Sequence, residues 1–387
     1  MDWLDPSFVR DLVENENYSI PVLSDYLKSV YPNQKGLSEG NLRKFCTFHG
    51  ISKPAKVDTK ELELAVSDAV AEVGGSYGRK MMKSHLEGKG ISAGEKRVGE
   101  ALATVHPFYH QRRQTSTHKQ MNPASYHAPN FGYNLHLDQN EKLVDFGVTF
   151  VLAVDGCSCF IPSFSAMRQK NNMIIYDSVY LAAVKAYGLW DQVIVDHGRE
   201  FYLSLFMQHY YRQASLSQRP PYRQVASTVN NRVERLWVEV NQRVGYPLKY
   251  ALISLENERN VVRENPLDFQ AMSQVSLAVA SHGLETFVHN WNNHHIPGKG
   301  VPASYIANKE NIVVDHLIMG AEDAKKLYLE QRPEAVITES KEELLKPENI
   351  AEVERVIAPV ATIFGSVANH DYKLFHDAIV YYRNKLQ

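Results

Sequence analysis

The sequence predicts a mixed α/β core that follows an all-helical region, and two observations carry this prediction. Between residues 18 and 105, apolar residues recur every three or four positions, which is the spacing of amphipathic helices. Between residues 133 and 198, short apolar runs bounded by turn residues replace that spacing. The last run, residues 191–198, shows no polar alternation, as expected of a strand that is buried on both faces.

Length and composition limit the classes of protein that the sequence can represent. The chain has 387 residues, of which 44% are hydrophobic, and this fits a globular protein of about two or three domains. It has no run of 18 apolar residues, so no membrane-spanning segment is predicted, and its acidic start lacks the layout of a signal peptide. Three cysteines (Cys46, Cys157 and Cys159) fit a reducing compartment better than a disulfide framework.

A first pair of helices is predicted within residues 18–50. PVLSDYLKSVY begins with proline and places Val22, Tyr26 and Val30 one turn apart, and PNQKG interrupts it. Ser38 is placed to cap the second helix, SEGNLRKFCTFHG. In that helix we expect inward-facing Leu42, Phe45 and Cys46 and outward-facing Arg43 and Lys44.

A second pair of helices is predicted within residues 76–105. SYGRKMMKSHLEGKG predicts one helix and its end, and SAGEKRVGEALATV predicts the next, with Ser92 and Glu95 forming a capping box. Two tandem helix-turn-helix units are one interpretation, and a plain helical bundle is the other. Basic residues on the outer faces of the second helices favour helix-turn-helix units that bind DNA: Arg43, Lys44, Lys96 and Arg97.

Charge is distributed unevenly, although the formal net charge is only −2. Residues 79–119 contain nine basic and three acidic side chains, whereas residues 321–360 contain ten acidic and six basic ones. Residues 106–134 have the Pro, His, Ser and Asn content of a linker, in which Arg112 and Arg113 suit a phosphate backbone. The sequence therefore predicts a basic middle region and an acidic tail.

The core is predicted to contain three meandering strands, a helix and then a parallel strand, which is an α/β arrangement. Pro162 would bend the third strand. The predicted strands are residues 133–139, 147–156, 159–167 and 191–198, and the predicted helices are residues 172–187, 230–244 and 273–292.

Three acidic residues are candidates for a metal-binding active site. Asp138 lies among apolar residues of the first strand, where a bare carboxylate is costly. Asp196 ends the fourth strand, and α/β sheets place ligands at the carboxyl ends of their strands. Glu234 lies at the edge of the apolar face of its helix. Converging carboxylates would repel one another, and two Mg²⁺ or Mn²⁺ ions about 3.5–4 Å apart would remove that repulsion.

Four segments together resemble the integrase core domain proteins of eukaryotic genomes, which are related to the Asp-Asp-Glu retroviral integrases and transposases. HLDQNEKL, VDGCSCFI, VDHGRE and NNRVERLW match that pattern in order and spacing, and WNNHHIPGKGVPASYI resembles the segment after the core. The resemblance implies an RNase H-like core, preceded by the helix-turn-helix units, with Asp138, Asp196 and Glu234 as catalytic metal ligands. The chain departs from the pattern at Gln139, Cys157, Cys159 and Phe201.

Several residues beside these motifs have a structural interpretation as well as a functional one. Asp155 is the rival first acid, but its position at a tight turn predicts a turn residue. Lys142, Arg199, Arg232 and Arg235 are candidate DNA contacts of the core. For the rest we expect satisfied imidazoles at His136 and His197, an exposed acid or cap at Glu200, a solvated acid at Glu239, a core anchor at Trp237, and helix packing at residues 290–295.

The resemblance implies a metal-dependent DNA integrase or transposase that cleaves a phosphodiester and transfers a strand. It also implies DNA as a partner, a homo-oligomer that brings two DNA ends together, and, for a eukaryotic chain, a nuclear location (otherwise cytoplasmic). The same hypothesis includes a domesticated descendant of such an enzyme. Two alternatives stay open. One is a DNA- or chromatin-binding protein whose core is catalytically degenerate. The other is a ribonuclease H-type nuclease.

The sequence predicts four segments. They are a helix-turn-helix-like unit at residues 1–56, a second such unit with a basic linker at 57–120, the core at 121–308, and an acidic linker with a helical end at 309–387. The helical end is an amphipathic helix, DYKLFHDAIVYYRNKLQ, which is expected to dock through Leu374, Ile379 and Tyr382.

Overall fold

The structure is a computed structural model, and the chain forms two compact units. One unit comprises Met1–Asp58 with Ile91–Ala93, and the other comprises Thr59–Gly90 with Gly94–Gln387. The structure describes residues 3–16, 18–51, 57–108, 126–213, 217–226, 230–259, 261–308, 318–337 and 347–387.

The first unit is helical. Its helices are α1 (Pro6–Arg10, continued by a π-helical turn, Asp11–Asn15), α2 (Ile20–Val30) and α3 (Glu39–Phe48). The inward face of α2 is formed by Leu23 and Leu27, whereas Val22 and Val30 are exposed, so the predicted apolar face is wrong by one residue. The Ser24 hydroxyl lies on the same buried face and donates a hydrogen bond to the Leu37 carbonyl at 2.7 Å.

Helix α3 follows its sequence prediction closely. Ser38 is its N-cap residue, although the Ser38 side chain makes no capping hydrogen bond. Leu42, Phe45 and Cys46 are buried in the core of the first unit. The helix therefore has the predicted inward face.

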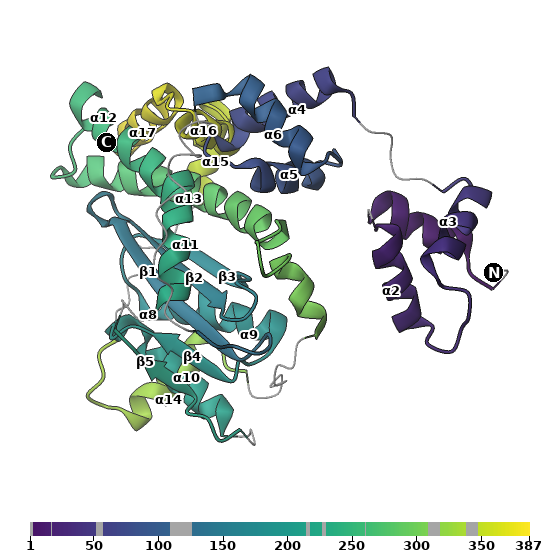
Figure 1. Cartoon of the computed structure of the whole chain (residues 1–387). Coiled ribbons are helices and arrows are strands. Elements are labelled where there is room, and N and C mark those ends of the chain that lie inside the picture. Colours follow the sequence, from purple (N-terminus) through teal and green to yellow (C-terminus); the bar gives the residue numbers. More distant parts are fainter. Residues whose placement is uncertain are drawn as a thin grey trace. The chain divides into compact units, whose positions relative to one another are not determined.

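The second unit contains a five-stranded sheet. Its strands are β1 (Asn134–Leu143), β2 (Val148–Asp155), β3 (Ser163–Met167), β4 (Gln192–Val195) and β5 (Tyr222–Gln224). The strand order is β3-β2-β1-β4-β5 (Figure 1). The pairs β3–β2 and β2–β1 are antiparallel, whereas β1–β4 and β4–β5 are parallel. The predicted mixed sheet is confirmed.

Helices pack on both faces of the sheet. They are α8 (Asn172–Ile174), which runs through a π-helical stretch (Ile175–Leu181) into α9 (Ala182–Tyr187), then α10 (Tyr202–Arg212), α11 (Asn231–Val240), α12 (Tyr246–Arg259) and α13 (Pro266–Asn293). Leu135 and Leu137 of β1 belong to the apolar core that the α8–α9 stretch and α10 cover. Since side chains alternate along a strand, Asp138 faces the opposite side, where α11 contacts β1.

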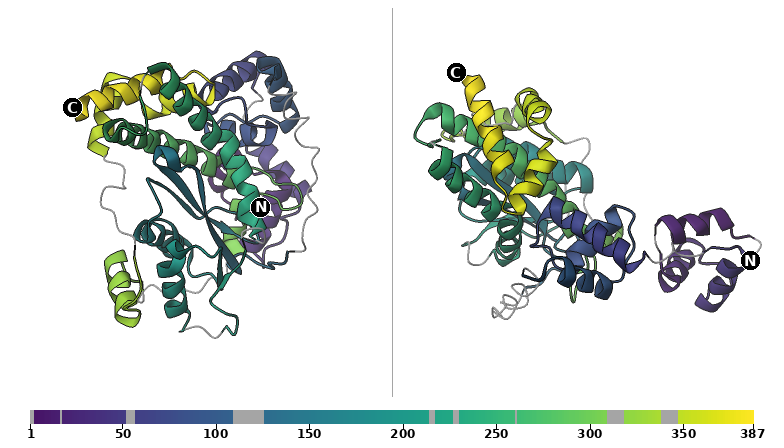
Figure 2. Two further views of the ribbon diagram at one scale, coloured as in Figure 1. Left: turned by 90° about the vertical axis from the view of Figure 1, so that its left-hand side faces the viewer. Right: turned by 90° about the horizontal axis from the view of Figure 1, so that it is seen from above.

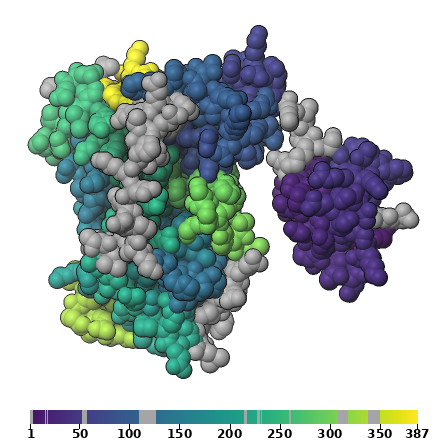
Figure 3. Space-filling view, in the orientation of Figure 1, coloured from purple at the N-terminus to yellow at the C-terminus, as the bar shows by residue number. Residues whose placement is uncertain are grey.

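The remaining helices of the second unit surround α13 and α10 (Figure 2). They are α4 (Thr59–Val73), α5 (Arg79–Gly88), α6 (Glu95–Val105), α14 (Ala321–Gln331), α15 (Pro347–Val356), α16 (Val360–Ala368) and α17 (Lys373–Leu386). Helix α16 contacts α4, so the two ends of this unit (blue and yellow in Figure 3) pack together. Gly365 belongs to this contact, since a Cβ there would collide with the Ala71 carbonyl oxygen.

Two predictions about these helices have different outcomes. The capping box of Ser92 and Glu95 is wrong, because α6 begins only at Glu95 and Gly94 is its N-cap residue. The last helix is confirmed as α17, which contacts α13; of its three predicted docking residues, Ile379 and Tyr382 are buried and Leu374 is half-buried. No helix in the part of the chain that the structure describes is long and apolar enough to span a membrane.

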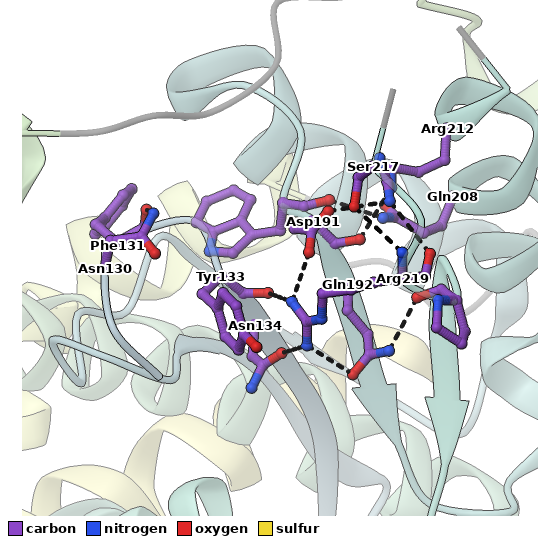
Figure 4. A network of polar contacts seen from close by, with 12 residues as sticks. Asn130, Phe131, Tyr133, Asn134, Asp191, Gln192, Gln208, Arg212, Ser217 and Arg219 are labelled. Atoms are coloured by element: carbon purple, nitrogen blue, oxygen red, sulfur yellow. Dashed lines mark hydrogen bonds and ion pairs between the residues drawn. The ribbon is translucent and has the colours of Figure 1, made fainter. Parts of the chain in front are cut away.

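The amino ends of β1 and β4 are held by a polar network around Arg219 (Figure 4). The guanidinium of Arg219 lies over the Tyr133 ring, 3.6 Å from its centroid, and pairs with Asp191 at 2.6 Å. Arg212 of α10 pairs with the other oxygen of Asp191 at 3.0 Å. Arg219 also donates to the Tyr133 carbonyl and to the side chains of Asn134 and Gln192. The network fixes the segment that leads into β5.

Candidate active site

Two aspartates lie on neighbouring strands: Asp138 is in the middle of β1, and Asp196 directly follows the carboxyl end of β4. In the parallel register of these strands, His136 lies beside Ile194, which is the last pair of the ladder. Two residues further along each strand, Asp138 and Asp196 occupy corresponding positions. This edge is where α/β sheets bind ligands. The backbone N–H of Gly198 donates to Asp196 Oδ1 at 2.9 Å, which orients that carboxylate.

Helix α11 brings the third acid to the same edge. Glu234 lies in the first turn of α11, which packs on β1 and β2. One turn later, the buried Trp237 donates its indole N–H to Asp138 Oδ2 at 2.9 Å. The helix is therefore tied directly to the strand acid. Trp237 has the predicted core role, and this hydrogen bond is an additional role that the apolar pattern of the helix did not indicate.

The charges of neighbouring acids contribute to the raised pKa of Asp138 and of Glu234. Burial raises the pKa of Asp138 to about 7, and the Trp237 hydrogen bond opposes this, while the charges of Glu234 and Asp196 add to it. Burial and then the charge of Asp196 raise the pKa of Glu234, and Lys142 lowers it. Mutual repulsion of this kind is what a bound cation relieves.

The donor set fits a hard divalent cation in its chemistry. All three groups are carboxylates, the ligands that Mg²⁺ and Mn²⁺ prefer, and none pairs with a basic side chain among the ion pairs of the described residues. Within the same residues, however, no three His, Cys, Asp or Glu side chains form a group that could hold a metal ion. The acids thus interact through their charges, but among the described residues their side chains do not form a closed metal-binding group.

A cavity of about 540 Å³, a common size for a ligand site, opens beside Glu234. It contains one cation, Lys142, near the Glu234 carboxylate. Amide side chains supply most of the other polar groups. The lining residues are Gln139, Asn140, Glu141, Lys142, Glu234, Trp237, Val238, Asn241, Gln242 and Tyr246.

Asp155 is a structural turn acid, as predicted. It is fully buried, and it lies opposite Leu135, three residues and about 10 Å along β1 from Asp138. Its Oδ2 accepts from the Gly132 N–H and from Trp190 Nε1, both at 3.0 Å. Its Oδ1 accepts from the Cys157 N–H and from the N–H and hydroxyl of Ser158. Five donors leave this carboxylate no role as a ligand.

Comparison with known families decides the identity of this region. Residues 125–302 match a family model described as the integrase core domain. The chain contains an integrase core domain. The match includes β1 to β5 and the three acids Asp138, Asp196 and Glu234. A comparison with curated proteins found no match to the chain.

The integrase core domain sets the general class of activity. It indicates an integrase- or transposase-like function and a polynucleotidyl-transferase family. Domains of this kind bind DNA and typically use divalent metal ions.

Histidines of the integrase core differ in their environments. His136 is buried, and its ring nitrogens contact the Tyr126 hydroxyl at 2.7 Å and Asn230 Oδ1 at 2.6 Å. Burial lowers the pKa of His136 to about 4. The prediction of a satisfied imidazole is confirmed for His136, whereas His197 is exposed.

The prediction that Glu200 is an exposed acid or cap is wrong. Glu200 is only 8% exposed, accepts a hydrogen bond from Gln139 Nε2, and lies 3.4 Å from Lys170 Nζ. At Gln139 the chain departs from the family pattern, and in this integrase core Gln139 has the buried Glu200 as its hydrogen-bond partner. Glu239 is half-buried and pairs with Arg243 at 2.5 Å, so it is not freely solvated.

The segment after the core packs as predicted. Asn290 to His295 include the end of α13, where Trp291 donates to the Cys159 carbonyl at 2.9 Å. Asn292 accepts from the Ile161 N–H and donates to the Ile161 carbonyl. These bonds fix the turn after β2 against α13.

The predicted DNA contacts lie in several places. Lys142 lies in the cavity beside Glu234, and Arg199 is exposed three residues after Asp196. Arg235 is exposed on α11, whereas Arg232 lies over the Tyr126 ring, 4.3 Å from its centroid. Arg43 (paired with Glu39), Lys44 and Lys96 (paired with Glu100) are exposed, Arg97 is half-buried, and Arg112 and Arg113 lie outside the described residues.

Proposed function

We propose that the chain is a metal-dependent DNA integrase or transposase-like enzyme that cleaves a phosphodiester and transfers the strand. The single observation that supports this most is the charge coupling of Asp138, Asp196 and Glu234 where β4 ends beside the middle of β1. The integrase core domain supports the same reaction class.

Asp138, Asp196 and Glu234 would hold the divalent ions, two Mg²⁺ or Mn²⁺ in this proposal. Such ions supply Lewis acidity toward the scissile phosphodiester. The chain's own contribution is positioning. Trp237 orients Asp138 through its 2.9 Å hydrogen bond, and Lys142 supplies a cation for a DNA phosphate.

DNA would also contact the basic helices outside the core. Arg43 and Lys44 on α3 and Lys96 on α6 present exposed cations. We propose that α2–α3 and α5–α6 act as helix-turn-helix units on a DNA end, and that two copies of the chain join two ends. For a eukaryotic chain, this substrate would place the protein in the nucleus.

A second candidate is a DNA- or chromatin-binding protein whose core no longer catalyses. Two observations favour it. The described residues include no closed three-ligand metal group. Gln139, where the chain departs from the family pattern, donates a hydrogen bond to the buried Glu200.

Strand transfer on candidate terminal-repeat DNA with Mn²⁺ separates the two proposals. We expect joined product from the wild-type chain and none from Glu234→Gln, which keeps the shape of the side chain but removes its charge. Glu239→Gln, on the same helix but outside the three acids, is the matched control and should retain product. Equal product from wild type and Glu234→Gln would end the catalytic assignment.

A further inference from the structure

A second cavity, of about 470 Å³, lies outside the site described above. Its walls come from α10, from β5, and from α14 with the segment that follows it; α14 contacts α10 (Figure 1). The α14 wall lies beyond residue 302, where the integrase core domain match ends. This cavity is therefore built partly from the core and partly from a segment outside the family match.

The cavity adjoins the edge of the sheet that carries the acids. Gln224 of β5 lines it and pairs with Val195, the residue before Asp196. Arg199 also lines it, three residues after Asp196. Tyr222 and Gln224 pair with Val193 and Val195, so their side chains lie on the sheet face that α10 covers, whereas Asp138 and Asp196 lie on the opposite face. A DNA strand leaving the acids would reach the cavity by crossing the carboxyl edge of the sheet at Arg199.

Aromatic rings supply the apolar part of the lining. Tyr202 and Tyr222 are 39% and 37% exposed, and Phe206 and Tyr328 lie with them in the lining. The Tyr328 ring packs against Phe206, with centroids 5.0 Å apart. Tyr202 and Tyr222 therefore present open ring surface, whereas Tyr328 and Phe206 support the cavity from within.

Positive charge dominates the polar part of the lining. Two guanidinium groups, Arg199 and Arg332, line it together with one acid, Glu334, and with His209. Neither guanidinium forms an ion pair with an acid in the portions of the chain that the structure describes. Burial raises the pKa of Tyr328 while Arg332 lowers it, and Tyr202, Glu334 and Tyr222 also influence it, so these groups share one space.

Open aromatic rings beside guanidinium groups are the combination that binds unpaired nucleotides. Bases stack on the rings without regard to sequence, and the cations meet the phosphates. We propose that this cavity binds an unpaired nucleotide at the end of a DNA strand, across the carboxyl edge of the sheet from the acids. This inference deepens the proposed function and rests on it for the identity of the nucleic acid.

Binding of a fluorescent DNA duplex with a short 3′ overhang, compared with its blunt counterpart, tests the proposal. Anisotropy is measured on the full chain in EDTA, so that no cleavage is required. We expect tighter binding of the overhang, by roughly fivefold or more for one stacked base. Tyr202→Leu combined with Tyr222→Leu should abolish this preference while leaving blunt-duplex binding unchanged.

Two further variants distinguish the cavity from general charge. Arg332→Gln should reduce the salt dependence of overhang binding by a slope of about 0.7, the value for one single-strand phosphate contact. Arg223→Gln is the matched control, because Arg223 lies between Tyr222 and Gln224 on the other face of β5, and it should leave the overhang preference intact. Thermal melts confirm that each variant folds.

Equal affinity for overhang and blunt DNA would overturn the proposal, and so would an overhang preference that survives in the double tyrosine variant. Failure of the proposed function has a different signature. Strand transfer would then be absent while the overhang preference persists, because the binding assay needs neither metal nor turnover. Conversely, strand transfer with no effect of the tyrosine substitutions on overhang binding would reject the cavity alone.

Discussion

Replacing Asp155 by alanine is expected to lower the free energy of unfolding by about 4 kcal/mol or more, since it strands several buried donors. The carboxylate accepts from the backbone of Gly132, Cys157 and Ser158 and from the Trp190 indole, with no exposure to solvent. Losing it leaves these groups without a partner in a region that water does not reach. The turn after β2 would lose its anchor to the core.

Urea denaturation of wild type, Asp155→Ala and Asp145→Ala measures this effect. Asp145 is the matched control, because it precedes β2 as Asp155 ends it, but its side chain is 72% exposed. We expect Asp145→Ala to change stability by less than about 0.5 kcal/mol. A loss below about 1 kcal/mol in Asp155→Ala would contradict the structural role and reopen Asp155 as the rival catalytic acid.

Replacing Asp138 by asparagine is expected to stabilise the metal-free protein at pH 8 by about 2 to 4 kcal/mol. The folded pKa of Asp138 is raised to about 7 from 3.8, chiefly by burial. Between these pH values the folded chain holds more protons at this site than the unfolded chain, so stability falls as pH rises from 3.8 to about 7. Asparagine removes that cost and can still accept the Trp237 hydrogen bond.

Urea midpoints of wild type and Asp138→Asn in EDTA, measured from pH 4 to pH 8, test this expectation. The advantage of the variant should be full at pH 8, shrink as pH falls below about 7, and vanish near pH 4. Asp145→Asn serves as the control, since its exposed carboxylate should show no such advantage. An advantage of Asp138→Asn that is constant with pH, or a loss of stability at pH 8, would contradict a buried acid at this edge.

The part of the fold that could be predicted was the part with the longest apolar runs in the sequence. The apolar runs around Leu135 and in β2 and β4 predicted the mixed sheet correctly, because burial on one or both faces decides such strands. Strand β5 has three residues and exposed side chains, so no apolar pattern marks it. Helix α16 is short and largely apolar, and its packing partner α4 lies far earlier in the chain, which no local spacing can indicate.

The candidate site was predictable in its acids but not in their partners. Asp138 and Asp196 stand out because each interrupts or ends an apolar run. The Trp237 hydrogen bond depends on how α11 crosses β1, which is a tertiary property. Glu200 was expected to be an exposed acid or cap, yet Gln139 and Lys170 from other elements contact it. The aromatic cavity needs residues from α10, β5 and α14, and the sequence separates these widely.

Thermal melts of the full chain with and without Mn²⁺ test most directly whether Asp138, Asp196 and Glu234 bind cations together. A ligand that binds only the folded state at 100 times its Kd adds about 2.7 kcal/mol of stability. We predict that Mn²⁺ raises the melting temperature of wild type and of Asp145→Asn, and leaves Asp138→Asn and Asp196→Asn unchanged. No response in wild type, or an equal response in all four proteins, would contradict the shared metal site.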